Sequence, residues 1–415
     1  MPTKKRNIFT KILIWRYKYI SERQFILVLS ILVGFLAGLG TVLLKYLTLF
    51  IQSVLEGGFI KNYYYSLYFI FPIIGVWLVY LIKKNFIKKE IGHGISTTLY
   101  SISKRSGIIE RYKMFASLLV APITVGFGGS VGLQGPAVST GAALGSNVAS
   151  LFHMNAKTRM LLIGCATAGA MSSMFKAPVA AIVFAIEIFS LDLVFASLVP
   201  LLLASIAAVI TSYFFRGTDV LFSFELLDAW RVKDIVFYVL LGLATGIASV
   251  YFSKMYFLIT RFFSRFSNAY IKIGIAAIAI GFMLYLFPPL YGEGYGLINN
   301  LLNGKTEAAL SGIQYQIDFN NIWMVIVILL IIAVFKAIAM TTTFAAGGVG
   351  GIFIPTLFMG SALGNAVAKA INQFGFEVSE ANFTLIGMTG LMAGVLHAPL
   401  TAIFLIAEIT GGYDL

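Results

Sequence analysis

The stretch GFGGSVGLQGPAVSTGAALG, residues 126–145, is matched later in the chain by FAAGGVGGIFIPTLFMGSALG, residues 344–364. Each stretch is a glycine-rich run that closes on a proline and continues into an apolar segment. Pro136 is as far from Gly145 as Pro355 is from Gly364. Such a repeat of membrane helices, interrupted at matching places, is typical of transport proteins built from two halves.

The composition indicates a membrane protein. Of 415 residues, 59% are hydrophobic and only 11% are charged, which excludes a soluble globule with a wetted surface. The apolar runs are continuous rather than alternating, so they predict helices and not barrel strands. Because glycine and proline break many of them, we expect short, tilted or half-crossing helices. The predicted fold class is an all-α integral membrane protein with an inverted repeat of tilted and broken helices. The apolar runs cover residues 24–44, 62–82, 114–156, 194–215, 235–253, 274–292, 337–368 and 381–407.

Charge and polarity divide the chain into four parts. Residues 1–24 are predicted to form a basic amphipathic segment on the cytoplasmic side of the cell membrane. Residues 25–215 form the first membrane repeat, 216–234 a connection, and 235–415 the second repeat. The net charge of +13 comes from basic residues that flank the spans, which favours a lipid bilayer and not nucleic acid as the partner. The polar stretch 291–321 is interpreted as a connection between spans.

The two glycine-rich runs favour an anion site. Glycines in residues 126–136 let the backbone approach a ligand, and Pro136 suits the first turn of the helix that follows. That helix begins inside the membrane, so its unpaired N–H groups and positive dipole end face a cavity, where an anion is the natural occupant. Residues 350–355 supply a second such helix start. The alternative is that the glycines only allow tight helix packing.

Three motifs resemble the signatures of the CLC family of chloride channels and chloride/proton antiporters, in its bacterial form. The family patterns are Gly-Ser-Gly-Ile-Pro, Gly-Lys/Arg-Glu-Gly-Pro and Gly-x-Phe-x-Pro. This chain has Gly92-His93-Gly94-Ile95-Ser96, Gly132-Leu133-Gln134-Gly135-Pro136 and Gly351-Ile352-Phe353-Ile354-Pro355. The resemblance runs from about residue 25 to the end. It implies a CLC-like fold and a homodimer in which each subunit has its own anion path.

The resemblance also implies the site residues. Chloride or a similar monovalent anion is the expected ligand, with no cofactor. We expect His93 either to donate an N–H to the anion and sense pH, or to bond a nearby carbonyl away from the path. No metal site or enzyme active centre is predicted, because no suitable cluster of histidine, cysteine or nucleophile occurs. The expected anion-binding residues are His93, Gly94, Leu133, Gln134, Gly135, Ile352, Phe353 and Ile354.

Two departures from the family pattern bear on coupling. The glutamate that acts as outer gate in the family is Gln134 here, and an amide neither titrates nor competes as an anion. The inner proton-relay position falls on Ile188. We therefore predict passive, proton-uncoupled anion conduction with Gln134 as the gate. The alternatives are a chloride/proton antiporter with a proton route that avoids those glutamates, and a membrane protein that no longer conducts.

Several further residues leave alternatives open. Glu187 is either a proton relay or, with its repeat partner Glu408, a structural group at a helix end, which we favour. Lys176 and Lys336 either draw anions into a vestibule or, as we favour, extend to a membrane interface. The chain ends at Leu415, before the family helix whose tyrosine contacts the central anion. It is either naturally short or a piece, and both imply an incomplete inner site.

Overall fold

The computed structural model describes residues 16, 18–56, 64–92, 94–190, 195–217, 222 and 231–410. Regular structure within these residues is helical, which confirms the predicted fold class. The helices of the first half are α2 (Glu22–Glu56), α3 (Tyr64–Ile82), α4 (Ile95–Arg105), α5 (Lys113–Gly126), α6 (Gln134–Leu151), α7 (Ala156–Phe175), α8 (Pro178–Phe189) and α9 (Phe195–Arg216). Those of the second half are α10 (Ile235–Ser264), α11 (Ala269–Leu286), α12 (Tyr295–Leu302), α13 (Thr306–Ala309), α14 (Ile322–Ala345), α15 (Phe353–Gln373), α16 (Glu380–Leu396) and α17 (Pro399–Ile409).

Among the described residues, six helices are long and apolar enough to cross a membrane. They cover Glu22–Leu55, Leu67–Ile87, Ala196–Arg216, Val232–Ser264, Ala269–Leu286 and Ile322–Ala345. Four further apolar helices, α5, α8, α16 and α17, are shorter, as the glycine and proline interruptions predict. The apolar run 114–156 is divided into α5 and α6 by a turn at residues 127–133, so neither helix need cross the whole layer.

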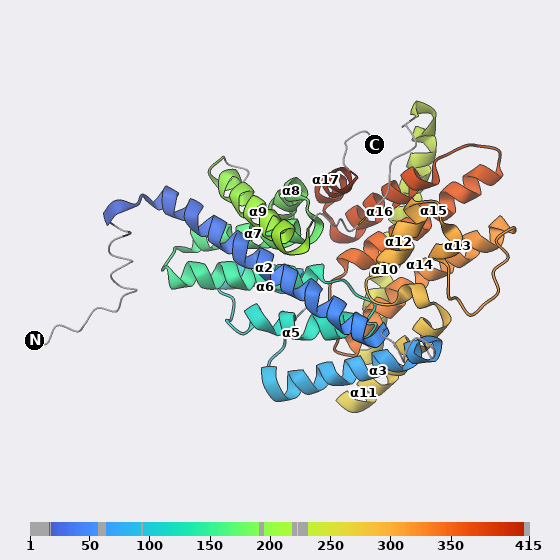
Figure 1. Ribbon diagram of the computed structural model, residues 1–415, viewed down its shortest axis with the longest axis horizontal. Coiled ribbons are helices and arrows are strands. Elements are labelled where there is room, and N and C mark those ends of the chain that lie inside the picture. Colours follow the sequence, from blue (N-terminus) through green and yellow to red (C-terminus); the bar gives the residue numbers. More distant parts are fainter. Residues whose placement is uncertain are drawn as a thin grey trace, which may run out of the picture.

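The two halves of the chain lie side by side (Figure 1). Helix α2 packs along α7 and α9 within the first half, whereas α3 crosses over to pack on α11 of the second half. Helices α8 and α17 meet between the halves, near the C-terminal end of the described chain. The halves are therefore interlocked, and residues far apart in sequence meet along their boundary.

The glycines inside the two signature helices serve helix packing. Gly141 and Gly145 of α6 lie against the backbone of α7, and Gly360 and Gly364 of α15 lie against the backbone of α16. A Cβ at any of these positions overlaps the neighbouring helix. The tight-packing interpretation thus accounts for the repeated Gly-x-Ala-Leu-Gly ending.

Glu187 and Glu408 exchange equivalent contacts across the two halves. The Glu187 carboxylate accepts from Leu400 N at 3.1 Å and Thr401 N at 2.8 Å, in the first turn of α17. The Glu408 carboxylate accepts from Val179 N at 3.0 Å and from Ala180 N at 2.8 Å, in the first turn of α8. Each carboxylate satisfies N–H groups that have no partner within their own helix. These contacts are those of a structural helix-end role.

Candidate functional site

The site begins where the glycine-rich runs of the two halves cross. Gly132 N donates to Gly351 O at 3.0 Å, and Gly351 N donates to Gly132 O at 2.7 Å. This is an isolated antiparallel bridge between residues that are far apart in sequence. Helix α6 begins two residues after Gly132, and α15 begins two residues after Gly351. The bridge therefore brings the positive ends of two helix dipoles to one place.

Glycine is required at this crossing because three backbones approach closely. A Cβ on Gly135 lies 2.8 Å from Gly351 Cα, and a Cβ on Gly351 lies 2.6 Å from Gly135 N. Gly94, the residue before α4, has a φ of +54°, and a Cβ there lies 2.6 Å from Gly135 O. No side chain fits these distances. The start of α4 thus joins the starts of α6 and α15.

Two cavities reach the crossing. The first, of about 360 Å³, is lined by Leu133 and by residues of α2, α9 and the connection before α12. The second, of about 310 Å³, is lined by Gly135, Gly351 and Ile352, together with Ile188 of α8. None of the described residues that line the second cavity is charged. The crossing therefore borders two cavities, one with charged lining residues and one whose described lining residues are uncharged.

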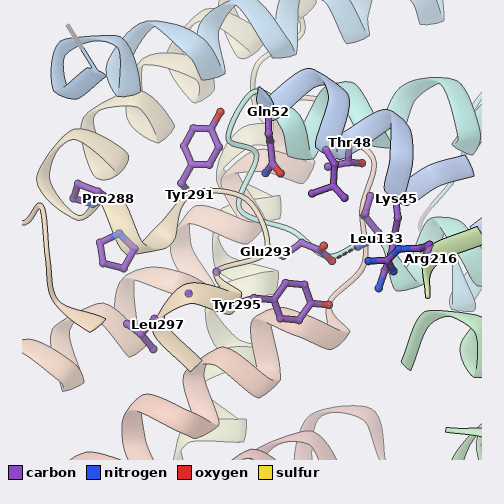
Figure 2. A pocket seen from close by; sticks show the side chains of 14 residues that line it. Lys45, Thr48, Gln52, Leu133, Arg216, Pro288, Tyr291, Glu293, Tyr295 and Leu297 are labelled. Carbon is purple, nitrogen blue, oxygen red and sulfur yellow. Dashed lines mark hydrogen bonds between the residues drawn. The ribbon is translucent and has the colours of Figure 1, made fainter. Parts of the chain in front are cut away.

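Glu293 occupies the α6 end of the first cavity, and the sequence analysis missed it. Its Oε1 accepts from Leu133 N at 3.0 Å, the backbone N–H of the residue before α6 (Figure 2). The Gln134 Nε2 lies 3.5 Å from the same oxygen and donates to the Tyr295 hydroxyl at 3.0 Å. A carboxylate is favoured at this position because the N–H groups and helix dipole carry partial positive charge. The group at the helix start is thus a negative side chain from the other half.

The backbone that carries Glu293 is firmly held. Lys336 Nζ donates to Gly292 O at 3.0 Å and to Leu290 O at 3.4 Å, and Ser130 Oγ donates to Leu290 O at 2.6 Å. Lys336 is fully buried in α14, so the prediction that it extends to an interface is wrong. Its cost of burial is offset by these carbonyls and by the Phe358 ring, 4.6 Å away. Lys176, at the end of α7, donates instead to Gly217 O at 2.6 Å.

Two cationic side chains line the same cavity as the half-buried Glu293 side chain. Lys45 of α2 and Arg216 at the end of α9 line the same cavity, on the side of Leu133 (Figure 2). Glu293 lies in the connection between α11 and α12, outside the spans. Burial raises the pKa of its carboxyl, while the Leu133 N–H, Lys45 and Lys336 oppose that rise without cancelling it. The carboxyl is therefore a titratable group beside the helix start.

The structure brings most of the predicted site residues together. Leu133, Gln134 and Gly135 form the start of α6, and Ile352, Phe353 and Ile354 the start of α15. All six are buried, except that Ile352 is partly exposed where it lines the second cavity. Gly94 meets them through Gly135, and Ile188 lies at the second cavity. His93 lies outside the described residues, so its predicted role stays a prediction.

Broken helices that converge on one point between two cavities define a membrane transport protein. A family model described as voltage gated chloride channel matches residues 74–415, and the chain belongs to that family, the CLC proteins. This is a family of anion transporters and not of enzymes.

Relatives and solved structures agree with this assignment. An H(+)/Cl(-) exchange transporter ClcA of Vibrio cholerae is 26% identical over 416 residues, covering 94% of this chain and 83% of the relative. A protein of Ralstonia nicotianae, named as a ClcB-like chloride channel protein, is 26% identical over 334 residues, covering 77% of this chain and 72% of the relative. The crystal structure of a CLC-type fluoride/proton antiporter superposes with a TM-score of 0.75 at 22% identity, over 93% of this chain and 90% of that chain. A slow cyanobacterial Cl-/H+ antiporter also gives 0.75, at 19% identity, over 95% and 91%.

Proposed function

We propose that this chain carries chloride or a similar monovalent anion across the membrane, between the N-termini of α6 and α15. The observation that carries the proposal is the Gly132–Gly351 bridge, which sets both helix starts between two cavities. The N–H groups there bind an anion through partial charges, which hold it less tightly than a buried cation does. In this proposal the path is lined by Gly94, Leu133, Gln134, Gly135, Ile352, Phe353 and Ile354, and His93, which lies outside the described residues, remains a predicted contributor.

We further propose that anion movement is coupled to proton movement in the opposite direction. Gln134 and Ile188 favour passive conduction, because neither can carry a proton. Two observations favour exchange instead. The relative from Vibrio cholerae, which matches 94% of the chain, is named as an H(+)/Cl(-) exchange transporter. A titratable carboxyl, Glu293, also lies beside Gln134 at the start of α6.

The test is chloride efflux from liposomes that contain the purified protein, with external chloride and pH recorded together. A potassium ionophore is added so that charge movement does not limit efflux. The proposal predicts chloride efflux with proton movement into the liposomes. Chloride efflux without proton movement supports passive conduction and contradicts exchange. Absence of any efflux from correctly folded protein contradicts anion transport itself.

The proposed assembly is a homodimer in the cell membrane, with the N-terminus in the cytoplasm. The support is the family resemblance and the basic residues of segment 1–24. Cross-linking in native membranes, with protease access to an N-terminal tag from one side, tests both statements. Monomeric protein contradicts the dimer, and digestion of the tag from outside the cell contradicts the orientation.

A further inference from the structure

We propose that Glu293 is the gate of the anion path, in place of the residue at position 134. Its carboxylate occupies the anion position at the start of α6, and an anion binds there when the carboxylate has taken up a proton and left. The proposal rests on the anion transport proposed above. In this proposal the gating charge lies in the connection before α12 and not at position 134 in the first half of the chain.

The first argument is competition for the same hydrogen-bond donors. Leu133 N, at 3.0 Å, and Gln134 Nε2, at 3.5 Å, both point to one oxygen of Glu293. A chloride ion at this helix start requires the same donors, and two negative charges cannot share them without strong repulsion. With the carboxylate in place the anion position is filled. Anion binding therefore requires that the carboxylate move away.

The second argument is that the side chain has room to move while its backbone does not. Lys336 and Ser130 hold the carbonyls of the Leu290–Glu293 segment. The Glu293 side chain is half-buried and faces the cavity of about 360 Å³. No salt bridge fixes its carboxylate among the described residues. A rotation about side-chain bonds is thus enough to clear the start of α6.

The third argument concerns the protonated form. Gln134 is fully buried, and its Oε1 has no hydrogen-bond partner among the described residues. A protonated carboxyl is a donor, so a half-turn of the Gln134 amide gives it an acceptor in place of the Leu133 N–H. One proton taken from cavity water neutralises the carboxylate and removes its attraction to the helix start. Position 134 then acts as a neutral partner of the gate.

Charged and titratable groups face Glu293 from every side. Lys45 lies on α2, Arg216 on α9, Lys336 on α14 and Tyr295 on α12, while α6 contributes the neutral Gln134. The nearby cations favour both the carboxylate and an incoming anion, so the local charge changes little when one replaces the other. Protonation of Glu293 is the step that decides between them. Because proton and anion binding are linked, each strengthens the other.

The experiment compares chloride efflux at equal internal and external pH for the wild type and Glu293→Gln. At pH values above the pKa of Glu293, wild-type efflux is expected to rise about tenfold for each unit that the pH falls. Glu293→Gln is neutral at every pH and is expected to conduct at the fast rate throughout. The matched control is Glu307→Gln, the same change at an exposed glutamate of α13, which is expected to keep the wild-type profile.

A second variant places a carboxylate at position 134, where the family has its gating glutamate. Gln134→Glu combined with Glu293→Gln is expected to restore the dependence on pH that Glu293→Gln alone loses. If Glu293→Gln keeps the wild-type pH slope, the gate proposal is overturned while anion transport stands. If the variant does not fold, chloride binding to the wild type decides. An affinity that tightens as pH falls supports the gate, and a flat affinity contradicts it.

Discussion

At the scale of single residues, the family resemblance implies one glutamate that both lies at the start of α6 and carries the gating charge. In the proposed gate these two functions are divided between Gln134 and Glu293. Gln134 keeps the position at the start of α6 and supplies a neutral amide. Glu293 supplies the negative charge from a backbone that Lys336 holds in place. The structure therefore pairs the loss of a carboxylate at one position with its presence at another.

Lys336→Met tests how the surrounding charge sets the titration of Glu293. Lys336 lowers the pKa of that carboxyl, because a nearby cation favours the charged form. Without it the pKa rises, so the pH at which chloride efflux is half-maximal is expected to increase. The measurement is the pH profile of efflux from liposomes, with exposed Lys254→Met as the control. A half-maximal pH that falls or stays unchanged contradicts the assignment.

At the scale of helices, the crossing of α6 and α15 depends on glycine. Gly135→Ala places a Cβ 2.8 Å from Gly351 Cα, so the two helix starts must move apart. We expect a loss of stability of roughly 1–3 kcal/mol and a decrease in chloride efflux of about tenfold or more. Thermal unfolding of the purified protein and efflux from liposomes measure these effects.

The control for that prediction is Gly242→Ala in α10, where an added Cβ has nothing within 4 Å. This variant is expected to keep both the unfolding temperature and the efflux rate. If Gly135→Ala and Gly242→Ala both keep the wild-type unfolding temperature and efflux rate, the close approach of α6 and α15 does not limit anion movement.

The exchanged contacts of Glu187 and Glu408 belong to the same scale. Glu187→Ala leaves the first N–H groups of α17 without acceptors and is expected to lower stability by about 1–2 kcal/mol. Glu187→Gln keeps an acceptor and is expected to fold normally with the ratio of protons to chloride unchanged. The measurement is that ratio in liposomes. A loss of proton movement in Glu187→Gln assigns Glu187 to a proton relay and contradicts the structural role.

The sequence predicts helices and their interruptions well, because glycine and proline act locally. The starts of α6 and α15, and the short α5, lie where the glycine-rich runs predict them. Lys336 was misinterpreted because a lysine inside an apolar stretch resembles the end of a span, and only the folded chain shows three carbonyls around it. Because of this single charge, the sequence analysis did not predict that α14 continues through Lys336.

Glu293 could not be predicted from local pattern. It lies in a polar connection, and Leu133, whose N–H it accepts, is far away in sequence in the other half. The only signal was an acidic residue between two glycines, Gly292 and Gly294, which both have positive φ. Such a turn is common in connections and does not by itself indicate a site. The pairing of the two halves is what places the carboxylate at the start of α6.

At the scale of the whole molecule, the two cavities differ in the charge of the residues that line them, and this difference bears on how an anion and a proton move. The first cavity contains Glu293 with Lys45 and Arg216, whereas no charged side chain lines the second. In the proposed path, an anion passes from one cavity to the other at the starts of α6 and α15. In the proposed exchange, a proton that leaves Glu293 toward the second cavity meets no carboxylate among the described residues that line it.

The central claim is that anion and proton movement are coupled, and the reversal potential tests it most directly. The membrane potential at which net chloride flux vanishes is measured in liposomes, with the chloride gradient fixed and the pH gradient varied. Coupled exchange predicts a reversal potential that shifts with the pH gradient. A reversal potential that stays at the chloride equilibrium value at every pH gradient contradicts exchange and supports passive conduction.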